Sequence, residues 1–384
     1  MNSKQIALPH YAKIAFVLII LISIGYIAVL GKDVMAPLAF SFLFATLLLP
    51  LTRFLEHKCK LGRGLAAMLS VLLFTAFVAA VIYIIAVQAG DLTDDWPKIK
   101  LQISHSIDDL HRWTVNKFRF QWNAQMMNLS KQLNAQAAPV IGTTLIGVTS
   151  MVLFLVFIFI DTFFILFYRK VLISFLLKVF SDDREVLVFD VAEQIQFIMK
   201  KYIFGLFLEM FCVFAIVFGL LSMLGVKYAL LLALVTAIFN LIPYVGIFSA
   251  MAISALLTLG TLDPAKAAEV AASIIAVHLI DSNIIMPRIV GSKVKLNALI
   301  VVLGVVVGEM LWGISGMFLA IPVLAIIKIL FDRIDDLKPW GLLLGDETEY
   351  QSTLVKRVAQ KSDSPKEAAK KAKDDIFDDS KKEK

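Results

Sequence analysis

Residues 228–262 decide the fold: they read YALLLALVTAIFNLIPYVGIFSAMAISALLTLGTL and contain no charged side chain. As one helix, these 35 residues would be about 52 Å long, because each residue adds about 1.5 Å. The hydrocarbon core of a membrane is only about 30 Å thick, so one straight crossing cannot hold them. The run is interrupted at NLIPYVG, from Asn240 to Gly246, where Pro243 lacks a backbone donor and the glycine favours a bend. The sequence therefore predicts a helical hairpin.

A second overlong apolar run covers residues 296–327 and also predicts a hairpin. Its interruptions are Gly304, Gly308, Glu309, Gly313, Gly316 and Pro322. Further stretches are long enough to cross a membrane as single helices, at about 14–31, 34–52, 64–90, 144–168, 202–224 and 267–287. The predicted fold class is all-α: a polytopic membrane protein with about six spanning helices, two helical hairpins and an amphipathic helical extracytoplasmic segment.

The composition of the whole chain agrees with a membrane protein. Apolar residue types make up 59% of the 384 residues and charged types 18%, against roughly 45–50% and 25% in soluble domains. A soluble globule is thereby excluded, and so is disorder over most of the length. The only two cysteines, Cys59 and Cys212, lie in unlike segments and predict two unpaired thiols. The net charge of +6 comes from short basic clusters beside apolar runs, which is typical of cytoplasmic loops.

These basic clusters orient the chain. Residues 53–63, RFLEHKCKLGR, hold four Lys or Arg residues against one acid and are therefore expected in the cytoplasm. By parity, both termini and residues 169–201 are cytoplasmic, whereas residues 91–143 lie outside. The first hairpin then enters from outside and the second from the cytoplasm. Each hairpin follows a spanning helix, so the two halves predict an inverted repeat, as in many secondary transporters.

Three segments are expected outside the hydrophobic spans. Residues 91–143 carry apolar stripes at helical spacing, which predict two amphipathic helices packed on the lipid interface or on a neighbouring subunit. The stripes are Ile99, Ile103, Ile107 and Leu110, and then Trp122, Met126, Leu129 and Leu133. Residues 169–201 predict a cytoplasmic amphipathic helix. The predicted domains are 1–90 (membrane helices), 91–143 (extracytoplasmic), 144–201 (one span and the cytoplasmic helix), 202–335 (the hairpin-containing transport unit) and 336–384 (a largely disordered cytoplasmic tail).

Three motifs near the hairpins carry a family likeness. They are the I-P-Y-V-G turn at 242–246, the N-x-x-x-P-R-x-x-G segment from Asn283 to Gly291, and the G-E-x-x-x-G-x-x-G-x-x-x-A-x-P run from Gly308 to Pro322. With YIFGLFL at 202, they make most of residues 10–335 resemble the autoinducer-2 exporter family. Two positions depart from the family pattern: Ala298 stands where a proline is usual, and Tyr168-Arg169-Lys170 replaces an acidic-glycine turn.

The resemblance implies a permease of the bacterial inner membrane, elevator-like in design and homo-oligomeric, with a pentamer as the expected assembly. Members of the family are linked to export of the quorum-sensing signal autoinducer-2, and others are described as sodium/proton antiporters. The two departures leave the expected fold unchanged but bear on the substrate. The expected partners are therefore a small polar solute, the lipid bilayer and further copies of the chain, without nucleic acid.

Ionisable side chains inside a membrane cost about 2.5–3.5 kcal/mol on insertion scales, so each requires a reason. We hypothesise that polar residues at the breaks of both hairpins converge and line the substrate path. Alternatively, Asp281 and Glu309 only hydrogen-bond backbone groups left unpaired at those breaks. The predicted substrate-path residues are Asn240, Pro243, Tyr244, Gly246, Asp281, Asn283, Glu309, Gly313 and Gly316; the ion-coupling candidates are Asp281, Glu309 and His278, which shares a helix face with Asp281.

Two further intramembrane acids, Asp161 and Glu209, are interpreted as interhelical hydrogen-bonding groups or subunit contacts rather than as coupling groups. The zinc, phosphate-loop and nucleophile-elbow motifs of common enzymes are missing from the sequence, so we expect no enzyme, cofactor or metal centre. Two functions stay open: a secondary exporter of a small polar metabolite, with ion or gradient coupling, and a sodium/proton antiporter. A non-transporting, lipid-binding membrane organiser is a third hypothesis.

Overall fold

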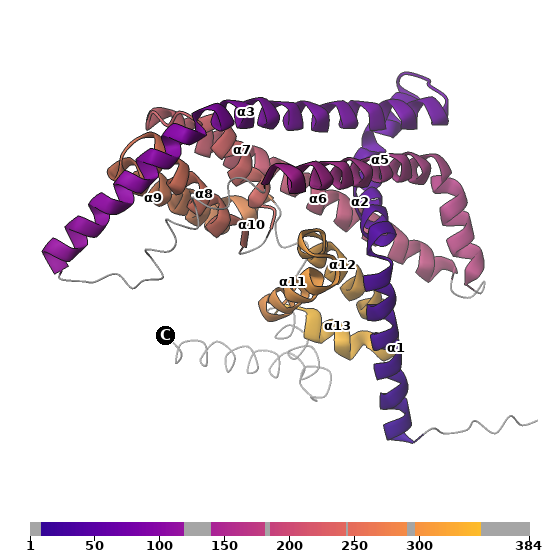
Figure 1. Cartoon of the computed structure of the whole chain (residues 1–384). Coiled ribbons are helices and arrows are strands. Elements are labelled where there is room, and N and C mark those ends of the chain that lie inside the picture. Colours follow the sequence, from indigo (N-terminus) through magenta and orange to yellow (C-terminus); the bar gives the residue numbers. More distant parts are fainter. Residues whose placement is uncertain (1–8, 119–139, 181–184, 243–244, 290–295, 347–384) are drawn as a thin grey trace, which may run out of the picture.

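The structure, a computed structural model, describes residues 9–118, 140–180, 185–242, 245–289 and 296–346. Every regular element in these ranges is a helix (Figure 1). Six of the described helices are long and apolar enough to cross a membrane: α2 (Lys32–His57), α3 (Arg63–Phe118), α5 (Val140–Val179), α6 (Glu185–Met223), α9 (Pro264–Ile280) with its continuation to Ile289, and α12 (Ile314–Arg333). This result confirms the predicted all-α polytopic membrane fold.

Five of the predicted spans coincide with long apolar helices of the structure. The predicted span 14–31 corresponds to α1 (His10–Leu30), whose described apolar part is shorter than the six long helices. By contrast, α12 was predicted as one arm of the second hairpin, yet its 20 residues reach the length of a full crossing.

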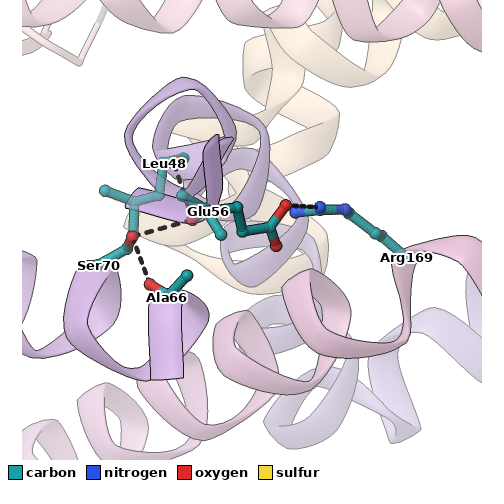
Figure 2. Close-up of polar contacts among 6 residues, drawn as sticks. Leu48, Glu56, Ala66, Ser70 and Arg169 are labelled. Carbon is teal, nitrogen blue, oxygen red and sulfur yellow. Dashed lines mark hydrogen bonds and ion pairs between the residues drawn. The ribbon is translucent and has the colours of Figure 1, made fainter. Parts of the chain in front are cut away.

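Polar side chains join α2, α3 and α5 into one unit (Figure 2). The Thr52 hydroxyl of α2 donates to Ser70 Oγ of α3 at 3.0 Å, and the Ser70 hydroxyl donates to the carbonyl of Ala66. Arg169 of α5 donates to Glu56 Oε2 of α2 at 2.5 Å, and both side chains are largely buried. Arg169, which belongs to one of the departures from the family pattern, therefore has an acidic partner on a neighbouring helix.

The helix α3 continues without a break past residue 90, where the sequence predicted the end of a span. In its part after residue 90, Ile99 and Ile103 are buried against Gly260 of α8 (Val245–Thr261), where an added Cβ would lie 2.5 Å from Ile99 Cγ2. This part of the first predicted stripe therefore packs on the chain's own first hairpin, which neither predicted alternative included. The second stripe, at 122–133, lies outside the described residues.

An ion pair attaches the same arm of α3 to the entrance of the first hairpin. Lys227 pairs with Asp95 of α3, and the Tyr228 hydroxyl also donates to this carboxylate. The hydrogen bond to Asp95 raises the pKa of Lys227, because it stabilises the charged ammonium. Gln102 donates to the carbonyl of Leu262 at 3.4 Å, so α3 contacts both the beginning and the end of this hairpin.

The segment 169–201, predicted as one connecting helix, is divided between two long helices. The first of these, α5, runs on to Val179, and α6 begins at Glu185. Neither proline nor glycine occurs between 169 and 201 to end either helix early.

The start of the predicted tail is also ordered. After a short 3₁₀ turn (Asp335–Leu337), α13 (Lys338–Leu344) packs against α12. The backbone N–H of Asn297 donates to the carbonyl of Leu344 at 2.9 Å, which ties α13 to the root of the second hairpin. Residues 347–384 lie outside the described ranges.

The first predicted hairpin is formed by α7 (Ala229–Phe239) and α8. Its two arms meet at the break that follows Asn240. A Cβ added to Gly246 would lie 1.7 Å from the carbonyl oxygen of Phe239, so the tip can close only because this residue is glycine. Pro243, predicted to contribute to the break, and Tyr244, predicted to line the substrate path, lie outside the described residues.

The second predicted hairpin is formed by α11 (Ala298–Trp312) and α12. The chain turns at Gly313, whose φ of +62° is in the region that favours glycine. Gly308 and Gly316 face each other across the arms, since a Cβ on Gly316 would lie 1.9 Å from the carbonyl oxygen of Gly308. Close backbone approach at small residues is a common way for membrane helices to pack.

We expect Ala298→Pro to leave the protein as stable as before, or to stabilise it by about 0.4–1 kcal/mol. Ala298 is the first residue of α11, where a backbone N–H has no intrahelical partner, and the preceding Asn297 has an extended backbone that suits a following proline. The departure from the family pattern is therefore compatible with the same local fold. Thermal unfolding in detergent checks this prediction, and a clear drop in the midpoint would contradict it.

The tips of both hairpins pack against α6. Leu241 of the first hairpin and Trp312 and Phe318 of the second lie in one apolar cluster around Tyr202 and Leu206 of α6. Each hairpin thus contacts the same long helix. That the hairpins enter from opposite faces of the bilayer stays a prediction.

Candidate functional site

Three buried polar side chains meet where the first hairpin breaks. Glu209 lies on α6, Asn240 follows the last residue of α7, and Asp281 begins a π-helical segment (Asp281–Ile285) that continues α9. The exposed fractions of Glu209 and Asp281 are 5% and 3%, so both carboxyl groups are almost fully removed from solvent.

The Asn240 amide bridges the two carboxylates. Its Nδ2 atom donates to Asp281 Oδ2 at 3.0 Å and to Glu209 Oε1 at 3.2 Å. The amide has two N–H donors, so it can serve both acceptors at once. Because both carboxylates accept from the same nitrogen atom, the two carboxyl groups lie side by side.

Local sequence explains why each element places its residue here. On α6, Tyr202, Leu206, Glu209 and Val213 recur at helical spacing on the buried face, so the glutamate points inward with the apolar residues. After α9, Pro287 cannot donate to a carbonyl one turn back, which favours a wider turn in this region. Single π-helical turns of this kind occur frequently at functional sites.

The charges of the pair are not balanced by protein groups in the described part of the chain. Glu209 Oε2 and Asp281 Oδ1 are buried and accept no hydrogen bond from a described residue. No lysine or arginine among those residues forms an ion pair with either carboxylate. Two ionised carboxylates in such a place would repel each other and lack solvation. The arrangement can therefore hold a shared proton or a bound cation.

The other predicted site residues lie in different surroundings. His278 lies one turn before Asp281; its Nε2 is 3.4 Å from the Ser282 hydroxyl, and its buried Nδ1 has no described hydrogen-bond partner. Asn283 is exposed and donates to the carbonyl of Leu279 in its own helix at 2.8 Å. Glu309 is exposed on α11 and forms no described hydrogen bond or ion pair with the buried cluster.

The structure thus brings together two of the predicted residues, Asn240 and Asp281, and adds Glu209. The sequence interpretation gave Glu209 an interhelical hydrogen bond, and the bond to Asn240 is of that kind. What it missed is that this bond places the glutamate beside Asp281. The available signal was the position of Glu209 on the buried stripe of α6. Asp161, interpreted in the same way, is half-buried on α5.

The predicted glycines have visible packing roles: Gly246 closes the first tip, Gly313 makes the second turn, and Gly316 packs on Gly308. Their contribution to a substrate path stays a prediction. Among the residues that the structure describes, no cluster of three or more His, Cys, Asp or Glu side chains could hold a metal ion.

A polytopic helical fold with ionisable groups buried at broken helices defines the class of membrane proteins in which secondary transporters are found. The chain belongs to the AI-2E transporter family: the model described as "AI-2E family transporter" matches residues 16–336. This match confirms the family resemblance read from the motifs and supports a transport protein of a membrane.

Individual relatives agree with this assignment. The chain is 28% identical over 315 residues to "Putative transport protein YueF" of Bacillus subtilis (strain 168), covering 73% of this chain and 79% of that protein. It is 26% identical over 312 residues to "Putative transport protein YrrI" of the same organism, covering 78% and 86%. A shorter match, 31% over 138 residues and 35% of this chain, relates it to a "Putative transport protein" of Haemophilus influenzae, of which it covers 39%.

Proposed function

We propose that this protein is a secondary transporter that exports a small polar solute of the autoinducer-2 type and that Glu209, Asn240 and Asp281 couple this export to protons. The observation that carries the proposal is the pair of buried carboxylates that share one amide donor, each with an unpartnered oxygen. A carboxyl pair of this kind takes up and releases a proton at low cost, because binding one proton removes the repulsion between the two groups.

The position of the pair suits a coupling role. It lies between two long apolar helices and the break of a hairpin, the kind of place where secondary transporters bind coupling ions. The hairpins are the moving parts in this proposal, and the unit of residues 202–335 shifts against α2, α3 and α5 in an elevator-like manner. The protein lies in the bacterial inner membrane with both termini in the cytoplasm, and it assembles as a homo-oligomer, with a pentamer as the expected form.

A sodium/proton antiporter is the second candidate. The unpartnered oxygens Glu209 Oε2 and Asp281 Oδ1 favour it, because carboxylate oxygens are also the ligands that a hard cation prefers. In this case, a proton and a sodium ion would compete for the same pair.

Flux measurements in proteoliposomes separate the two candidates. The purified protein is reconstituted, a pH gradient is imposed, and the movement of protons is recorded with sodium alone and with a panel of small polyols that includes autoinducer-2. Polyol movement that depends on the gradient supports the exporter, whereas sodium-dependent proton movement without polyol supports the antiporter. No flux of either kind would overturn the proposal and favour a membrane organiser.

A further inference from the structure

The three residues of the buried cluster belong to parts of the fold with different freedom to move. Glu209 is in the interior of α6, a helix of 39 residues, and Asp281 continues α9. Asn240, by contrast, stands at the tip of a hairpin, directly after the last residue of α7. Both hydrogen bonds of the amide therefore run from a hairpin tip to full-length helices.

The two arms of the tip are closely packed against each other. Gly246 is so close to the carbonyl of Phe239 that the start of α8 and the end of α7 are in backbone contact. Leu241, the neighbour of Asn240, packs against the apolar cluster on α6. The two bonds of Asn240 therefore add a polar attachment at the tip to the apolar contacts that already join this hairpin to α6.

We infer that Asn240 is the positioning residue that latches the first hairpin to the coupling pair, so that proton loading of Glu209 and Asp281 releases the hairpin tip. This inference rests on the proposed function. Hydrogen bonds to ionised acceptors are about twice as strong as those to neutral ones, so the amide holds the tip most firmly when the pair is ionised. Once the pair takes up a proton, the amide faces less negative charge, and its bonds to the carboxyl oxygens weaken.

Few other titratable groups face this latch. On α6 the nearby titratable residue is Tyr202, two turns before Glu209 on the same buried face, and on α9 it is His278, one turn before Asp281. Neither α7 nor α8 contains a titratable residue, and Arg288 of α10 (Met286–Ile289) is exposed. The pH response of the tip is therefore assigned to the carboxyl pair, with His278→Gln as the variant that checks the histidine.

Cysteine labelling in liposomes tests the latch. Cys59 and Cys212 are replaced by serine, and Leu241→Cys then introduces a single thiol at the tip. The labelling rate of this thiol is divided by the labelling rate of a second protein, whose only cysteine is the exposed Cys59. With Asn240 present, this ratio should rise about tenfold from alkaline to acidic pH, as the charge-assisted bonds are lost. In Asn240→Ala, the ratio should be high and should change less than about twofold with pH.

Two further variants keep the result interpretable. Asn240→Gln retains a carboxamide donor and should restore part of the pH response, which a purely structural role would not require. Ser249→Ala, on the same hairpin, removes a hydroxyl that bonds only within α8 and should label like the parent protein. If Asn240→Ala does not yield a monodisperse protein, Asp281→Asn replaces it, and its labelling should depend less on pH than that of the parent, because only Glu209 of the pair can then gain or lose a proton.

Labelling that is independent of pH in the parent, or equally dependent on pH in Asn240→Ala, would overturn the latch. So would loss of the response in His278→Gln alone. These outcomes differ from a failure of the proposed function: if flux still requires Glu209 and Asp281 while labelling ignores pH, then the coupling pair stands and only the latch is wrong.

Discussion

Glu209→Gln and Asp281→Asn are each expected to reduce strongly the dependence of transport on the proton gradient while leaving the protein inserted and monodisperse. Each substitution keeps the shape of the side chain and an acceptor for Asn240, but it removes one of the two groups that share the proton. Coupling energies between two sites are typically 1–3 kcal/mol, so the gradient dependence of flux should fall by about 5- to 150-fold. Proteoliposome flux at several imposed gradients measures this directly.

The matched control is Asp161→Asn, another intramembrane acid that is half-buried on α5 and has no described bond to the cluster. It should keep the gradient dependence of the parent. Glu309→Gln tests the alternative coupling site, because the sequence hypothesis gave Glu309 a coupling role. If Glu309→Gln abolished coupling and Glu209→Gln did not, the coupling site would belong to the second hairpin and the buried pair would be structural.

Gly316→Leu is expected to prevent the second hairpin from forming. A Cβ at this position would lie 1.9 Å from the carbonyl oxygen of Gly308, which is backbone and cannot rotate away. Overpacking usually costs 1–3 kcal/mol, and here α11 and α12 would have to separate, so we expect a cost of about 3 kcal/mol or more. The yield of monodisperse protein after membrane extraction, together with its thermal midpoint, measures the effect.

Gly219→Leu is the matched control for this loss. Gly219 also lies in an apolar membrane helix, α6, but nothing is found within 4 Å of an added Cβ. The leucine should therefore be accepted with little change in yield. Similar yields for Gly316→Leu and the control would show that α11 and α12 do not pack through these glycines.

The first hairpin could be predicted because its 35 uncharged residues are too long for one membrane crossing, and because proline and glycine mark the break between its arms. The association of Asn240 with Asp281 could also be predicted, since polar residues at breaks in membrane helices tend to converge. The turn at Gly313 and the packing of Gly316 follow from the same residues that suggested the second hairpin.

The partner role of Glu209 could not be predicted, because hydropathy places a residue inside the membrane without saying which neighbouring helix it faces. The course of α3 was missed for a related reason. Periodicity marks a helical face but does not mark where a helix leaves the bilayer, and the burial of Ile99 and Ile103 against Gly260 depends on contacts far apart in sequence. The residues of α13 are held by contacts with α12 and by the hydrogen bond to Asn297. The sequence pattern within α13 itself does not predict these contacts.

The hydrogen bond between Asn297 and Leu344 gives the second hairpin a mechanical connection to the rest of the chain. Because α13 follows α12 and folds back to the start of α11, both ends of this hairpin are fastened to the same short helix. Tension applied to the residues after 346 would therefore reach α13 first and then the base of this hairpin. A tether or fused protein on that side would pull on α11 and α12, whereas one before residue 9 would pull on α1.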